Sequence, residues 1–65
     1  MITINGQKTE LLSPVSVTDY LEQNQYRPNR IAVELNGEIL PKSHYADTML
    51  KDGDSMEIVS FVGGG

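Results

Sequence analysis

Apolar and polar positions alternate at the start of the chain, where residues 2–5 are Ile-Thr-Ile-Asn. A period of two is typical of a strand with one buried face. Asn5-Gly6 follows, a pair that tolerates positive φ in a two-residue hairpin turn. We expect a second strand to return over residues 8–12, and Ser13-Pro14 to end it because proline lacks the ladder donor.

The apolar spacing then changes to three and four, which is typical of one face of a helix. The residues on this face are Val17, Tyr20 and Leu21. Ser16 precedes them as an N-cap, with Asp19 three positions on in an arrangement like a capping box. We expect a helix of about three turns that ends near residue 25 or 26, because Pro28 follows.

Alternation returns over residues 31–35, Ile-Ala-Val-Glu-Leu, and predicts a third strand. Asn36-Gly37 marks a second turn before a short extended piece over 38–41, whose proline argues against a central position. Residues 42–51 have no clear period, and we expect a loop that covers one edge of the core. A short helical turn that includes Tyr45, Met49 and Leu50 is the alternative.

Asp52-Gly53-Asp54 is a turn signal, and the last strand follows it over residues 56–62. Apolar residues occupy both faces of that strand, which predicts a central place in the sheet. The whole order is strand, strand, helix, strand, short strand, strand. It predicts an α+β fold in which one helix packs across one face of a single sheet of four to five strands.

With 65 residues the chain forms one domain at most, and a fold of this size buries only about 60% of the surface of its unfolded chain. There is no cysteine, which excludes disulfides and thiolate metal sites, and one histidine, His44, cannot build an imidazole site. We therefore expect no bound metal, and stability that comes from ordinary packing.

Five Lys and Arg residues against nine Asp and Glu give a net charge of −4. Nucleic-acid binding depends on clustered cations, so this balance argues against it and favours a partner with a basic surface. No cationic stretch precedes an apolar run at the N-terminus, and no apolar run is long enough to cross a membrane. We expect a soluble, cytoplasmic protein.

The side chains offer little for catalysis. No serine sits in a glycine-flanked turn that would expose a nucleophile to His44, which we interpret as a surface residue. Asp52 and Asp54 lack the further oxygen ligands of a calcium loop, and the glycines form no phosphate-binding loop.

The end of the chain, Val62-Gly63-Gly64-Gly65, is the feature that remains. Glycines lack a Cβ, so such a tail passes through a channel too narrow for side chains and adopts any φ/ψ that an enzyme imposes. At about 3.3 to 3.6 Å per residue it extends roughly 10 Å beyond the folded body. The ionised terminal carboxylate is a usable nucleophile towards a nucleotide phosphorus. A frayed or merely small tail on a non-reactive binding module is the alternative.

Here the sequence resembles the ThiS family, the sulfur carriers of thiamin biosynthesis. The resemblance covers essentially the whole chain. Its markers are the length, residues 33–42 (Val-Glu-Leu-Asn-Gly-Glu-Ile-Leu-Pro-Lys) with Tyr45 after them, the turn 52–54 leading to Glu57-Ile58-Val59, and the end Phe61-Val62-Gly63-Gly64-Gly65. The glycine end alone would also fit the small subunit of molybdopterin synthase or a ubiquitin-like modifier. The resemblance implies a β-grasp (ubiquitin-like) domain over residues 1–62 and a flexible glycine tail over 63–65.

It also implies a mechanism. A ThiF-like adenylating enzyme would use ATP and magnesium to activate the Gly65 carboxylate, a persulfide protein would supply sulfur to form a thiocarboxylate, and thiazole synthase would consume it. The chain itself would bind no cofactor. Gly63 and Gly64 would thread the enzymes' channels, with Phe61 and Val62 as the apolar docking surface. Core packing is the alternative for Phe61. A carrier for molybdopterin or another sulfur pathway is the alternative function.

Overall fold

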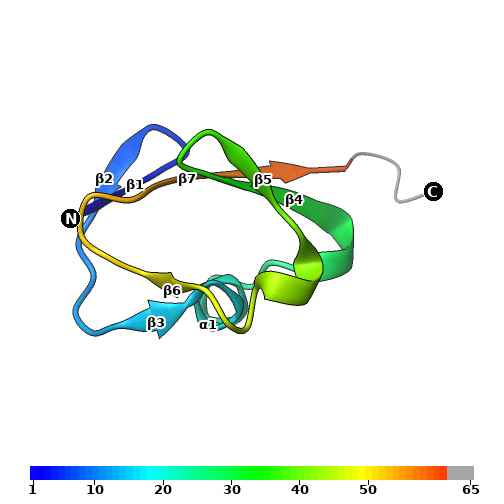
Figure 1. Ribbon diagram of the computed structural model, residues 1–65, viewed down its shortest axis with the longest axis horizontal. Coiled ribbons are helices and arrows are strands. Elements are labelled where there is room, and N and C mark those ends of the chain that lie inside the picture. The colour runs from blue at the N-terminus through cyan, green and yellow to red at the C-terminus, as the bar shows by residue number, and fades with distance from the viewer. Residues whose placement is uncertain (62–65) are drawn as a thin grey trace.

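The computed structural model describes residues 1–61 and arranges them as a sheet with one main helix beneath it (Figure 1). The strands are β1 (Ile2–Ile4), β2 (Gln7–Thr9), β3 (Val15–Ser16), β4 (Ile31–Leu35), β5 (Glu38–Leu40), β6 (Met49–Leu50) and β7 (Ser55–Ser60). The helix α1 spans Val17–Gln23, and two 3₁₀ helices span Pro28–Arg30 (η1) and Lys42–His44 (η2).

The main sheet has five strands in the order β2-β1-β7-β4-β5. The β1–β7 pair is parallel and the other pairs are antiparallel. The last strand is therefore central, as predicted, because it inserts between the two hairpins. This mixed sheet with a single helix across one face confirms the predicted α+β, β-grasp architecture.

The core lies between the sheet and α1. The fully buried side chains are Ile2, Val17, Leu21, Val33 and Met56. Two of them, Val17 and Leu21, come from the predicted apolar face of the helix, and the other three from β1, β4 and β7. Burying a side chain of this size contributes about 1.5–3 kcal/mol to the folded state, before the loss of conformational entropy is subtracted.

Both hairpins turn through an asparagine and a glycine in the left-handed region. Asn5 has φ 50° and Gly6 φ 82°, while Asn36 has φ 53° and Gly37 φ 86°. Two consecutive positive φ values define a type I′ turn, whose twist matches the flanking strands. Both predicted turns are confirmed.

The predicted N-cap is also confirmed, since Ser16 Oγ accepts a hydrogen bond of 3.0 Å from the Asp19 N–H. The helix ends earlier than predicted, at Gln23, so it has two turns rather than three. Gln25 adopts φ 63°, and the Tyr26 N–H bonds the Leu21 carbonyl at 2.8 Å. Together with the 3.1 Å bond from the Gln25 N–H to the Glu22 carbonyl, this bond forms a Schellman-type C-cap. Sequence reasoning missed the cap because glutamine occupies the position where glycine is usual.

Three further boundaries differ from the predictions. The second strand ends at Thr9 rather than residue 12, because the chain then descends from the sheet to the helix layer (Figure 1). The segment 42–51, predicted to be a loop, contains η2 and the strand β6, which pairs with β3. The last strand ends at Ser60 within the described residues.

Candidate functional site

The polar groups that could carry chemistry are dispersed over the fold. His44 is exposed on η2, which confirms it as a surface residue, and Ser16 is buried as the helix cap. Within residues 1–61 no three His, Cys, Asp or Glu side chains gather closely enough to hold a metal ion. The side chains of the described part of the chain thus form neither a nucleophile–base pair at His44 nor a metal centre.

Asp52 and Asp54 serve the structure of their turn. Asp52 pairs with the N-terminal ammonium group. Asp54 is buried, and its carboxylate accepts hydrogen bonds from the Lys51 N–H at 2.9 Å and from Asn36 Nδ2 at 3.1 Å. Burial raises the pKa of Asp54, but these bonds and the Lys51 charge outweigh it, so the pKa lies below its ordinary value. The turn interpretation of this motif is confirmed.

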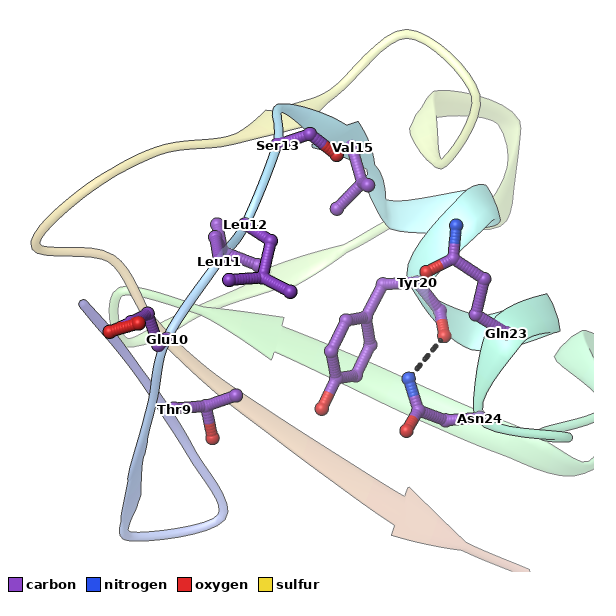
Figure 2. A pocket seen from close by; sticks show the side chains of 9 residues that line it. All are labelled: Thr9, Glu10, Leu11, Leu12, Ser13, Val15, Tyr20, Gln23 and Asn24. Atoms are coloured by element: carbon purple, nitrogen blue, oxygen red, sulfur yellow. Dashed lines mark hydrogen bonds between the residues drawn. The ribbon is translucent and has the colours of Figure 1, made fainter.

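A depression of about 380 Å³ lies between the segment after β2 and α1 (Figure 2). Leu11, Leu12 and the ring of Tyr20 line its apolar part, and Gln23 and Asn24 line its polar rim. Burial and the neighbouring Tyr26 raise the pKa of the Tyr20 phenol above its ordinary value. Glu10 is the one carboxylate among its lining residues, so the depression lacks an acid–base pair.

The strand that leads to the glycine end is held firmly at its start. Asn36 Oδ1 accepts a 2.9 Å hydrogen bond from the Ser55 N–H, and Asn5 Oδ1 accepts a 2.7 Å bond from the Ile58 N–H. The side chains of both hairpin turns therefore bond the backbone of β7 from opposite sides. Phe61 extends the pairing with β4 by one bond, from its N–H to the Arg30 carbonyl at 2.8 Å.

The face of the sheet opposite α1 has exposed apolar side chains near this exit. Val59 and Phe61 are 56% and 55% exposed. Phe61 lies outside the core, so the core-packing alternative for this residue is wrong. Val62, Gly63, Gly64 and Gly65 lie outside the described residues, and their predicted roles stay predictions.

Two acidic residues accompany this apolar pair. Glu57 on β7 stands directly opposite Glu34 on β4, and strand alternation places both on the same face as Val59. Like charges directly opposite each other destabilise a sheet. Sequence reasoning missed Val59, Glu57 and Glu34 as site candidates. The alternation of buried residues predicts the face on which each of them lies, whereas the pairing of Glu57 with Glu34 needs the register of the structure.

The fold and this site define a class: a small β-grasp protein whose central strand leads towards the glycine-rich end of the sequence. The comparisons with known proteins agree. The model of the ThiS family matches residues 2–65, and the chain therefore belongs to the ThiS family.

Individual relatives support this assignment. The sulfur carrier protein ThiS of Bacillus subtilis is 36% identical over 66 residues, which cover all of both chains. The crystal structure of the thiamine biosynthesis protein ThiS from Geobacter metallireducens superposes with a TM-score of 0.83 at 34% identity, covering 98% of this chain and 97% of that one.

A thiazole synthase of Paramagnetospirillum magneticum is 41% identical over 64 residues. These cover 98% of this chain but only 20% of the synthase, so the chain spans about a fifth of that relative. A unit of this family thus occurs within a longer protein that is named for thiazole synthesis.

No helix among residues 1–61 has the length and apolar character needed to cross a membrane. The cytoplasmic location stays a prediction.

Proposed function

We propose that this chain is a sulfur carrier of thiamin biosynthesis, with the carboxylate of Gly65 as its reactive group. The observation that carries the proposal is the family match, which extends over residues 2–65 and so includes the glycine end. The polar and titratable side chains of residues 1–61 are dispersed over the fold. This arrangement supports the proposal, because a carrier reacts through its main-chain carboxylate and needs no catalytic side chains.

The first step is activation. A ThiF-like adenylating enzyme binds ATP and magnesium, and an oxygen of the Gly65 carboxylate attacks the α-phosphorus, so pyrophosphate leaves and an acyl-adenylate forms. This chain contributes the carboxylate and binds no cofactor of its own. Gly63 and Gly64 thread the enzyme's channel, where the absence of Cβ atoms permits close approach.

The second step is sulfur transfer. The outer sulfur of a persulfide protein attacks the carbonyl carbon of the adenylate, and AMP leaves with the bonding electron pair. A second thiol then attacks the cysteine sulfur of the resulting acyl disulfide. It forms a disulfide with the persulfide protein, and the acyl-bound sulfur leaves with the bonding electron pair as the thiocarboxylate of Gly65. Thiazole synthase consumes this sulfur. The thiazole synthase among the relatives favours this destination over molybdopterin synthesis.

Docking involves the open face of the sheet beside the exit of β7. Phe61 and Val59 supply exposed apolar area, and Glu57 and Glu34 supply negative charge. Val62 is a further apolar contact in this proposal, on its place in the sequence alone. A partner surface with apolar groups flanked by Lys or Arg complements this face, and such charge complementarity raises the association rate. The unfavourable pair of glutamates gains a favourable cation between them in the complex.

A pair of substitutions in the tail tests the proposal. In an assay of ATP–pyrophosphate exchange with the ThiF-like enzyme, we expect Gly64→Val to abolish exchange and Gly64→Ala to reduce it less, because valine is branched at Cβ. Both variants should melt at the temperature of the unaltered chain. Exchange at the normal rate with Gly64→Val would contradict the narrow-channel mechanism, and absence of exchange with the unaltered chain would contradict the proposed function.

A further inference from the structure

The strand β7 is central over its first half and forms an edge over its second half. At its start it pairs with β1 through Thr3↔Ser55 and Ile4↔Met56. β1 ends at Ile4, and the hairpin then turns away from β7, so that β7 runs on past the β1–β2 hairpin towards the C-terminal end (Figure 1). On its other side β7 stays paired with β4 as far as Ile31↔Ser60.

The hydrogen bonds show which backbone groups point to the unpaired side. Ser55 and Phe61 bond the residues that flank β4 at its two ends: the Asn36 N–H donates to the Ser55 carbonyl at 2.7 Å, and the Phe61 N–H donates to the Arg30 carbonyl at 2.8 Å. Backbone groups alternate in direction along a strand. The groups of residues 56, 58 and 60 therefore point away from β4, towards the side where β1 ends.

On that side, pairing stops at Ile58. The Asn5 N–H bonds the Met56 carbonyl at 2.9 Å, and Asn5 Oδ1 accepts from the Ile58 N–H. Beyond this point the Ile58 carbonyl and the N–H and carbonyl of Ser60 have no hydrogen-bond partner among residues 1–61. The Ser60 N–H is a donor that lies along the strand between two acceptors, the carbonyls of Ile58 and Ser60, at the spacing of a strand ladder. Ser60 is exposed.

We infer that an extended segment of the ThiF-like adenylating enzyme pairs with this edge and adds a strand to the sheet beside Ile58–Ser60. The inference rests on the proposed function, because it concerns the enzyme that takes the Gly65 carboxylate. Gly65 is the fifth residue after Ser60, so the two are at most about 18 Å apart along a fully extended chain. The enzyme surface around its active site therefore comes close to the open edge whenever the carboxylate is in place.

The added strand fixes the point from which the glycine tail starts. Main-chain bonds to an exposed edge are a general mode of peptide recognition, and they fix the direction of the strand that receives them. With β4 on one side and the enzyme on the other, the end of β7 is held on both sides, and the glycines start from a fixed point. An unpaired strand edge promotes aggregation with other chains, and the short length of this edge limits that risk.

Ser60→Pro tests the inference, with Ser60→Ala as the matched control. Proline removes the N–H of Ser60, which points away from β4, and places a ring at the edge, so it breaks no bond of the β4–β7 ladder. We expect Ser60→Pro to bind the adenylating enzyme at least about tenfold more weakly and Ser60→Ala to bind like the unaltered chain. Equal affinity of a folded Ser60→Pro variant would overturn the inference.

Hydrogen exchange of the unaltered chain gives a second test that does not depend on the folding of a variant. In the free protein the Ser60 amide should exchange fast and the Phe61 amide slowly, since within residues 1–61 the Phe61 N–H has a hydrogen-bond acceptor and the Ser60 N–H has none. In the complex, Ser60 exchange should slow by at least about tenfold. Unchanged exchange in a formed complex would overturn the added strand, whereas the proposed function fails separately if the same enzyme adenylates none of the unaltered chain.

Discussion

Asn5 makes a specific contribution to stability that a series of substitutions can divide into two parts. Its backbone adopts φ 50°, and its side-chain oxygen accepts the 2.7 Å bond from the Ile58 N–H. Aspartate keeps the acceptor and tolerates positive φ, glycine keeps only the freedom of φ, and alanine keeps neither. The series Asn5→Asp, Asn5→Gly and Asn5→Ala therefore removes the two contributions one after the other.

The magnitudes follow from the two interactions. Loss of a hydrogen bond costs about 0.5–1.5 kcal/mol, and the left-handed conformation costs a residue with a Cβ about 1–2 kcal/mol. We expect Asn5→Asp to be nearly neutral, Asn5→Gly to lose about 1 kcal/mol and Asn5→Ala about 2–3 kcal/mol. For a domain of this size 1 kcal/mol corresponds to about 4–8 °C in Tm, so the alanine variant should melt on the order of 10–20 °C lower.

Thermal unfolding followed by circular dichroism measures the series. Asn29→Ala serves as the control, because Asn29 is exposed on η1 and its side chain makes no hydrogen bond within residues 1–61. Its Tm should stay within about 2 °C of the unaltered chain. Equal shifts for Asn5→Gly and Asn5→Ala would refute the role of φ, and a neutral Asn5→Gly would refute the role of the bond.

Other parts of the structure lead to further predictions. Because the pKa of Asp54 is lowered in the fold, its charged form stabilises the protein above the ordinary pKa of 3.8, and this stability is lost as the pH falls through the lower folded pKa. On acidification, the Tm of Asp54→Asn should therefore fall less than the Tm of the unaltered chain. Equal acid sensitivity would contradict the stabilising role of the hydrogen bonds to the Asp54 carboxylate. Phe61→Ala should weaken binding to the adenylating enzyme about tenfold with a Tm change within about 4 °C, because the ring is more than half exposed. A large loss of Tm would place Phe61 in the core instead. Glu57→Lys should slow association with a basic partner and make it less sensitive to salt; an unchanged rate in a stopped-flow measurement would exclude this face from docking.

The strands and turns of the sheet could be predicted because their signals are local. Alternation over residues 31–35 specifies one buried face, and Asn-Gly pairs specify the turns. The pairing of β3 with β6 could not be predicted, because two-residue strands have no period and their partners lie far apart in sequence. The early end of α1 depends on Gln25 at positive φ, where glutamine gives no signal.

The site divides in the same way. The glycine end could be predicted as a candidate site from its composition alone. Phe61 could be predicted as a candidate because it directly follows the last strand. The open edge at Ser60 is not visible, because it depends on where β1 stops beside β7. The Glu34–Glu57 pair likewise depends on the register between two strands whose sequences are separated by a turn, a 3₁₀ helix and two short strands.

The central claim is that Gly65 receives sulfur, and intact mass spectrometry tests it most directly. The chain is incubated with the ThiF-like enzyme, ATP, magnesium and a persulfide donor, with a known ThiS carrier as the positive control. The account predicts a mass gain equal to the replacement of one oxygen atom by sulfur, located at Gly65 by fragmentation and absent without ATP. An unchanged mass in a reaction that converts the control carrier would contradict the account.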